Sequence, residues 1–364
     1  MPTTRGRRAT FVVRALLLLG VAALPVAFSA WIDPARLIAP RSAEREIARV
    51  LATGTNVTNF ASYDDRAIEK YLAPMRARPE VLVLGSSRMQ VLRGCAGAEL
   101  RGCATATPTA FVNGAMQAAV LDDMLGVYGL YDAPGRRPNR VYIGVDPWTE
   151  HATGSGWRSL AAERAMVLRR AGIPVSPRRD VIGVWARAVG TLATPAYFRL
   201  ALTSFRRYGA QGLGWQPAAR AQNAGTTKLP DGSVTWPPVS DDAAERAAAR
   251  FASTELAHDA RFHDFKRRAP GRDDALERFL RYLQSEGVSA TVVLVPFPAT
   301  VYDASLRLSG DSLPSVERRV RTIAARTGAR VAGSYDPRVA EVSSREFFDE
   351  EHLRPDALAR VAAR

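Results

Sequence analysis

Short apolar runs, each separated from the next by sequence with helical periodicity, organise the chain from about residue 78 onward. Two amphipathic stretches, "DDALERFLRYLQSEG" and "PSVERRVRTIAARTG", predict helices ahead of the last two runs. Apolar strands that alternate with helices are typical of a parallel sheet covered on both faces. We therefore expect an α/β fold of three layers, α/β/α, with a parallel sheet of about five strands. The five candidate strands are Val81–Leu84, Thr109–Ala115, Arg140–Trp148, Ala290–Pro298 and Ala329–Tyr335.

This pattern has two interruptions. Residues 33–77 contain helix-like stretches without strands, which suggests a stalk ahead of the α/β domain at residues 78–364. Residues 150–272 combine helix-like pieces with turn signals such as "LPDGS", and we interpret them as a helical insertion between the third and fourth strands. Four tryptophans in the insertion either stack on sugar rings or serve as packing residues: Trp157, Trp185, Trp215 and Trp236.

The N-terminus has the features of an export signal. An uncharged apolar stretch, Ala15–Ile32, is near the minimum length for crossing a bilayer. Four arginines precede it and favour a cytoplasmic N-terminus: Arg5, Arg7, Arg8 and Arg14. A cleaved signal peptide is the alternative to an uncleaved signal anchor, and Trp31 favours the anchor as an interfacial residue. We expect residues 1–32 to form a cytoplasmic tip and single-pass anchor in the bacterial inner membrane, with the body in the periplasm or outside.

Composition and cysteine content narrow the function classes. Only three of the 50 basic residues are lysines, and the arginines that make up the net charge of +14 are scattered. This distribution argues against nucleic-acid binding but allows attraction to an anionic surface. Two cysteines, Cys95 and Cys103, are too few for a metal set. In an oxidising compartment they favour a disulfide worth about 2–3 kcal/mol. We expect no metal and no cofactor.

Candidate chemistry follows the first predicted strand. The stretch "VLVLGSSRMQ" ends its apolar run at Gly85 and continues at once with Ser86, Ser87 and Arg88. Ligands of open parallel sheets bind beyond the carboxyl ends of the strands, which is where these serines are expected. By itself Gly-Ser-Ser also fits a strand-to-helix turn with a serine cap. Arg88 either holds an acidic substrate near Ser87 or is solvated.

The C-terminal stretch "FFDEEHLRPDALARV" supplies partners for a serine. Asp349 and His352 lie three residues apart, immediately before a helix that Pro355 would help to start. A serine hydroxyl becomes a nucleophile when a base takes its proton, and an imidazole works best when a carboxylate fixes its tautomer. The two segments together predict a Ser-His-Asp triad. His258 and His263, in the charged stretch "ELAHDARFHDFKRR", are expected to be solvated.

The order of these motifs resembles the SGNH (GDSL-like) hydrolase superfamily. A strand ending in Gly-x-Ser, an Asn-Gly turn, a third strand ending in Gly-x-Asx and a C-terminal Asp-x-x-His span residues 81–355. "LGSSR" on an exported, anchored chain is similar to the branch containing the teichoic-acid D-alanine-transfer and alginate O-acetylation proteins. The resemblance implies an SGNH/flavodoxin-like fold, with Ser87 as nucleophile, His352 as base and Asp349 as orienting carboxylate.

The same resemblance implies an oxyanion hole, and here the chain departs from the family. The N–H groups of Ser87 and of Gly114, in "VNGA", would donate to the oxyanion. Where the family has an asparagine donor, this chain has Asp146, and loss of one donor costs about 3–4 kcal/mol of transition-state stabilisation. Asn113 is a substitute donor. Asp146 either caps a helix begun by Pro147 or binds a hydroxyl or amine of the substrate.

Three functions fit these observations. The leading one is an exported serine acyltransferase or esterase that adds or removes O-acyl groups on a cell-envelope polysaccharide. For that function a multi-pass membrane acyltransferase is a candidate partner, and the envelope polysaccharide is the acyl acceptor. The alternatives are a non-catalytic carbohydrate-binding or scaffolding protein that keeps the fold, and a carboxylesterase for small substrates.

Overall fold

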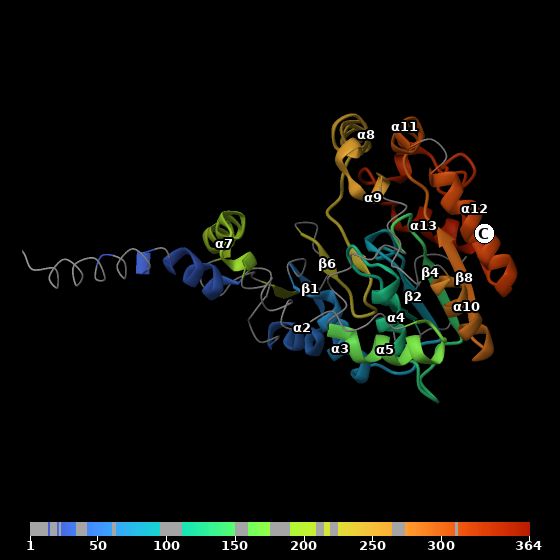
Figure 1. The fold of residues 1–364 in the computed structure, drawn as a ribbon, viewed down its shortest axis with the longest axis horizontal. Helices are drawn as coiled ribbons and strands as arrows, with labels where there is room; N and C mark the ends of the chain where they lie inside the picture. Colours follow the sequence, from blue (N-terminus) through green and yellow to red (C-terminus); the bar gives the residue numbers. More distant parts are fainter. Residues whose placement is uncertain are drawn as a thin grey trace, which may run out of the picture. The chain divides into compact units, whose positions relative to one another are not determined.

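The computed structural model describes the chain in two units, and each is considered by itself (Figure 1). Residues 1–42 with 176–215 form the smaller unit, and residues 43–175 with 216–364 form the larger. The described residues are 14, 20, 21, 23–33, 42–59, 63–94, 111–149, 159–174, 190–208, 215–218, 225–263, 274–309 and 312–364. Cys95, Cys103, His151, Trp157 and Trp185 lie outside them.

The described part of the smaller unit contains a helix over residues 23–32 and helix α7 (Pro195–Tyr208). Phe28 contacts the rings of Phe198 and Phe205, with both centroid distances at 5.7 Å. Among the described residues, no helix is both long enough and apolar enough to cross a membrane. The signal anchor therefore stays a prediction.

The larger unit is built on a parallel sheet of five strands, which confirms the predicted α/β class. The order across the sheet is β3-β2-β4-β8-β9. The chain adds β3 on one side of β2 and all later strands on the other side, so the strand order reverses at the boundary between β2 and β4. Each strand overlaps one of the predicted apolar runs: β2 (Val81–Leu84), β3 (Phe111–Asn113), β4 (Arg140–Gly144), β8 (Ser289–Leu294) and β9 (Arg330–Gly333).

Both faces of this sheet are buried. Leu82 and Leu84 of β2 pack into a core that includes residues of α4, α10 and α12, whereas Val81 and Val83 pack into a second core with α13. Figure 1 shows α10 beside β8, and α12 packs against β9 and α10. The helices around the sheet are α4 (Leu121–Gly129), α5 (Ala161–Arg170), α10 (Ala275–Ser285), α11 (Ala299–Ser309), α12 (Ser312–Thr327) and α13 (Pro355–Ala363).

The prediction of a stalk at residues 33–77 is wrong for the part from residue 43 onward, which belongs to the larger unit. Helices α2 (Ser42–Ala52) and α3 (Asp65–Leu72) are amphipathic, and their apolar faces are buried within that unit. Strand β1 (Asn56–Thr58) pairs antiparallel with two strands of the predicted insertion, β5 (Gln216–Ala218) and β6 (Thr227–Lys228). The helices are therefore core elements of the larger unit.

The predicted insertion is not purely helical. Strand β7 (Val234–Thr235) extends the antiparallel sheet to the order β5-β1-β6-β7. Helices α8 (Asp241–Arg250) and α9 (Ala260–His263) follow, separated by a π-helical and a 3-10 turn. The short strands escaped prediction because two or three residues carry no readable alternation. The other short helices that the structure describes in the larger unit are η1 (Ala73–Met75), η2 (Ser87–Met89), η6 (Phe251–Glu255), η7 (Leu256–His258) and η8 (Ser344–Glu346).

Candidate active site

The turn after β2 presents one serine and buries the other. Gly85 has φ +154°, and a Cβ there would lie 2.6 Å from Met89 Cγ, so this position requires glycine. Ser86 is buried and caps η2 by accepting a hydrogen bond from the backbone N–H of Arg88 at 3.2 Å. Ser87 is half-buried and begins η2. The serine cap expected for a plain turn therefore falls on Ser86, which leaves the Ser87 hydroxyl available.

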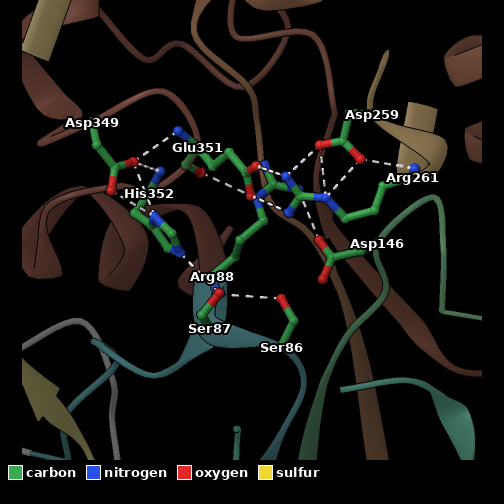
Figure 2. Close-up of polar contacts among 9 residues, drawn as sticks. All are labelled: Ser86, Ser87, Arg88, Asp146, Asp259, Arg261, Asp349, Glu351 and His352. Atoms are coloured by element: carbon green, nitrogen blue, oxygen red, sulfur yellow. Dashed lines mark hydrogen bonds and ion pairs between the residues drawn. The ribbon is translucent and has the colours of Figure 1, made fainter. Parts of the chain in front are cut away.

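Three side chains form the hydrogen-bonded chain expected of a triad (Figure 2). Ser87 Oγ lies 2.9 Å from His352 Nε2. His352 Nδ1 lies 2.8 Å from Asp349 Oδ2 and 2.9 Å from Oδ1. Asp349 Oδ1 also accepts the backbone N–H groups of Glu351 and His352, both at 2.8 Å. A nucleophile, a base and an orienting carboxylate are thus in direct reach of one another.

The loop that carries His352 is held by aromatic packing and by the helix that follows it. Phe347 and Leu353 form an isolated antiparallel bridge, and Pro355 begins α13 as predicted. The ring of Phe348 stacks on the imidazole with centroids 5.4 Å apart, and Trp236 contacts it at 5.6 Å. Of the four tryptophans predicted in the insertion, Trp236 is the one that the described structure places beside the base.

Charge and hydrogen bonding prepare this histidine to accept a proton. Burial lowers the pKa of His352, but the hydrogen bond and charge of Asp349, with a smaller effect from Glu351, raise it above its usual value. Burial raises the pKa of Asp349, whereas hydrogen bonds from His352 and from two backbone N–H groups lower it below its usual value. The site therefore favours an imidazolium beside a carboxylate, which is the state produced when Ser87 gives up its proton.

Arg88 lies in the interior with its guanidinium fully engaged (Figure 2). Its Nη1 donates to Asp146 Oδ1 at 2.7 Å, and the guanidinium lies 3.7 Å from the centre of the Phe297 ring. Its other donors bind backbone carbonyls beyond β8 and in the histidine loop: Val295 at 2.6 Å, Pro296 at 2.6 Å and Glu351 at 3.1 Å. One side chain therefore ties together the loops after β2, β4 and β8 and the loop carrying His352.

This arrangement corrects the interpretations of Arg88 and Asp146. Arg88 is 0% exposed, so it is neither solvated nor presented to a substrate. Asp146 is 2% exposed and is paired with Arg88. Residues 147–149 form a turn, so no helix begins at Pro147 for Asp146 to cap; its Oδ1 is bound by Arg88, and its Oδ2 has no hydrogen-bond partner among the described residues. Two opposite charges buried together compensate each other, which explains an aspartate where the resemblance implies asparagine.

The expected oxyanion donors are also largely engaged. The N–H of Gly114 donates to the carbonyl of Val83 at 2.8 Å, within the sheet. Asn113 is fully buried, and its amide donates to three carbonyls of the serine loop, so it holds that loop in place: Met89 at 2.9 Å, Gln90 at 3.2 Å and Leu92 at 2.8 Å. Gly114 and Asn113 are therefore not oxyanion donors in this structure. Ser87, as the first residue of η2, has an N–H with no acceptor inside that helix.

The insertion also supports the loop that carries His352, through ion pairs of Arg261 that the sequence did not predict. Arg261 donates to the carboxylates of both Asp259 and Glu351, and the contact of its Nη1 with Glu351 Oε2 is 2.9 Å (Figure 2). Glu351 in turn accepts Arg88 through its backbone carbonyl. No sequence signal separates Arg261 from the many other arginines. Its neighbour His258 is exposed, as predicted.

The site has the parts for acyl transfer through a serine. It offers a half-buried hydroxyl, a base hydrogen-bonded to it, and one backbone donor beside it. Within the part of the chain that the structure describes, no three His, Cys, Asp or Glu side chains gather in a way that could hold a metal ion. The chain has no match among family models, curated proteins or solved structures.

Proposed function

We propose that this protein is an exported serine esterase or O-acyltransferase of the SGNH type that acts on a cell-envelope polysaccharide. The observation that carries the proposal is the continuous hydrogen-bonded chain from Ser87 through His352 to Asp349. Such a chain couples loss of the serine proton to formation of a stabilised imidazolium.

The proposed reaction has two steps. His352 Nε2 accepts the proton of Ser87 Oγ while this oxygen attacks the carbonyl carbon of an acyl ester. The alcohol leaves with the proton from His352, and an acyl-serine remains. A sugar hydroxyl or water then attacks the acyl-serine and gives its proton to His352, which returns it to Ser87 as the ester bond to the serine breaks.

The strand order supports an SGNH/flavodoxin-like, three-layer fold. Counted along the chain, the five parallel strands lie in the order 2-1-3-4-5. In sheets of this order, ligands bind at the point where the strand order reverses. Ser87 follows β2 and Asp146 follows β4, so both lie at that point. The nucleophile is therefore proposed at the position that the topology favours.

Export, anchoring and a polysaccharide acceptor are proposed from the N-terminal pattern and from the resemblance. The arginines followed by the apolar stretch Ala15–Ile32 support a single-pass inner-membrane protein with its body in the periplasm or outside. A multi-pass membrane acyltransferase is the proposed partner, since it would supply acyl groups across the membrane.

A non-catalytic carbohydrate-binding role is the second candidate, and one observation favours it. Among the expected oxyanion donors, Gly114 and Asn113 are engaged elsewhere and Asp146 is paired with Arg88. Only the N–H of Ser87 stays available, and oxyanion stabilisation is usually the largest single contribution to catalysis of this kind.

A fluorophosphonate probe distinguishes the two candidates on the full-length protein. We expect wild type to be labelled at Ser87, Ser87→Ala to show no labelling, and His352→Ala to be labelled far more slowly. Labelling that persists in Ser87→Ala would contradict the triad. A wild type that resists labelling would support the binding role.

Product analysis separates the enzymatic alternatives. We expect purified protein given an acetyl ester and an oligosaccharide acceptor to yield acylated oligosaccharide. Rapid hydrolysis of small esters that an acceptor does not change would instead identify a carboxylesterase.

A further inference from the structure

A pocket of about 110 Å³ lies next to the rings that pack on His352. Its walls come from the loop after η2, from the insertion and from the loop that carries His352. The side chains relevant here are Arg93, Trp236, Pro237, Phe348, Arg354 and Pro355. The pocket therefore adjoins the triad and shares with it the segments that position Ser87 and His352.

Arg93 is the unusual member of this lining. It is half-buried, its Nε is shielded from solvent, and it makes no hydrogen bond or ion pair with any described residue. Arg354, on the opposite loop, binds Asp241 Oδ1 at 2.7 Å and the carbonyl of Val239 at 3.2 Å. Leaving a desolvated charged donor without an acceptor costs free energy. An anion in the pocket would supply the missing acceptor for Arg93.

Trp236 supplies the second unsatisfied group. Its indole Nε1 is buried and has no acceptor among the described residues. Its ring contacts Phe348 at 5.7 Å, and prolines 237 and 355 extend the apolar lining. An aromatic ring with a polar N–H suits a ligand that is apolar on one face and polar at its edge, as a sugar ring is.

We propose that this pocket is a subsite for an anionic sugar unit, with Arg93 binding the anionic group and Trp236 contacting the ring. A guanidinium binds carboxylate, sulfate and phosphate in the same forked geometry, so these groups share the required chemistry. The proposal rests on the proposed function, in which a glycan is the substrate. It adds that the glycan carries negative charge close to the acylated position.

The test measures binding rather than turnover. Full-length Ser87→Ala protein is titrated calorimetrically with trigalacturonate, with a phosphorylated sugar and with a neutral galactose trisaccharide. We expect an anionic ligand to bind at least about tenfold more tightly than the neutral trisaccharide, and this preference to shrink as salt is raised. Preference for trigalacturonate identifies a carboxylate subsite, and preference for the phosphorylated sugar identifies a phosphate subsite.

Substitutions assign the preference to the pocket. Arg93→Gln removes the charge and is expected to abolish the preference, whereas Arg93→Lys keeps the charge and is expected to retain part of it. Arg326→Gln is the matched control, because Arg326 is 63% exposed on α12 and lines no part of the pocket. Circular dichroism checks that each variant is folded.

Two results overturn the proposal. One is that the Ser87→Ala protein binds anionic and neutral ligands equally tightly. The other is that folded protein with the added Arg93→Gln change keeps the full preference for the anionic ligand. Failure of the proposed function is a separate result, since it appears as absence of fluorophosphonate labelling at Ser87. Binding in the Ser87→Ala background does not depend on that labelling.

Discussion

Two aspartates near Ser87 hold positive partners in very different ways. Asp349 holds His352, an imidazole that gains and loses a proton, and its side chain is 28% exposed. Asp146 holds Arg88, a guanidinium that stays charged, and both side chains are essentially inaccessible to solvent at 2% and 0%. The first pair suits proton movement, and the second suits fixed positioning.

This difference explains how the chain accommodates an aspartate, Asp146, in the Gly-x-Asx motif after the third strand. A lone buried carboxylate would repel a developing oxyanion, but one neutralised by Arg88 acts as an anchor between loops. Arg88 also binds the carbonyl of Glu351, next to His352. The fixed pair therefore holds in place the loops between which the titrating pair operates.

Removing the charge of Asp349 is expected to have the largest effect on turnover. In Asp349→Asn the amide cannot hold the imidazole in the same tautomer or stabilise the imidazolium, so kcat should fall by about 10⁴-fold. Ester hydrolysis followed at saturating substrate measures this. Retention of most of the turnover would show that the Asp349 contact does not support the base.

Removing the charge of Asp146 is expected to reduce stability instead. Asp146→Asn restores the residue that the SGNH resemblance implies, yet it leaves the Arg88 guanidinium buried without its counter-charge. The free energy of unfolding should fall by about 3–5 kcal/mol, measured by urea denaturation. A variant as stable as wild type would show that the pair is not the anchor described above.

A matched surface pair and a double variant are the controls. Asp303→Asn removes one of the two carboxylates paired with Arg338, where the side chains of Asp303 and Arg338 are 40% and 57% exposed, and should change stability by about 0–1 kcal/mol. Arg88→Met with Asp146→Asn should cost less than the sum of the two single changes, since the second change then uncovers no unpaired charge.

The strands and the triad could be predicted because their signals are local. Apolar runs locate all five parallel strands, and Asp349 and His352 lie only three residues apart in the sequence. The alternative for Gly-Ser-Ser was a plain turn, and the structure places Ser87 and His352 in contact although they are 265 residues apart in the sequence. The predicted strand pattern was enough to place these two distant segments at the same edge of the sheet.

The partners of Arg88 and Arg261, and the absence of one for Arg93 among the described residues, could not be predicted. Each arginine looks the same in a chain with this composition, and what distinguishes them is burial and the loop opposite, which depend on tertiary packing. The engagement of Gly114 and Asn113 is of the same kind, because a donor's acceptor is set by the sheet register and not by the motif around it.

The pH dependence of kcat/KM distinguishes the Asp349–His352 pair from the Asp146–Arg88 pair. The pKa of His352 is raised, and the imidazole must be neutral to accept the serine proton, so kcat/KM should fall with decreasing pH through a value above the ordinary pKa of about 6.5. In Asp349→Asn the main raising influence is lost while burial still lowers the pKa, so this limb should move to lower pH. Asp146→Asn should leave it nearly in place. If Asp349→Asn leaves the acidic limb of the kcat/KM profile in place, a group other than His352 causes that limb.

Among the residues of the site, Ser86 provides the smallest expected effect, because its side chain only positions the turn. Its Oγ accepts the backbone N–H of Arg88 at the start of η2, so Ser86→Ala loses one cap hydrogen bond. The free energy of unfolding should fall by about 1 kcal/mol, while fluorophosphonate still labels Ser87. Loss of labelling in a folded Ser86→Ala protein would show that the cap positions the nucleophile as well as the turn. Ser86 could then not be assigned to structural positioning alone.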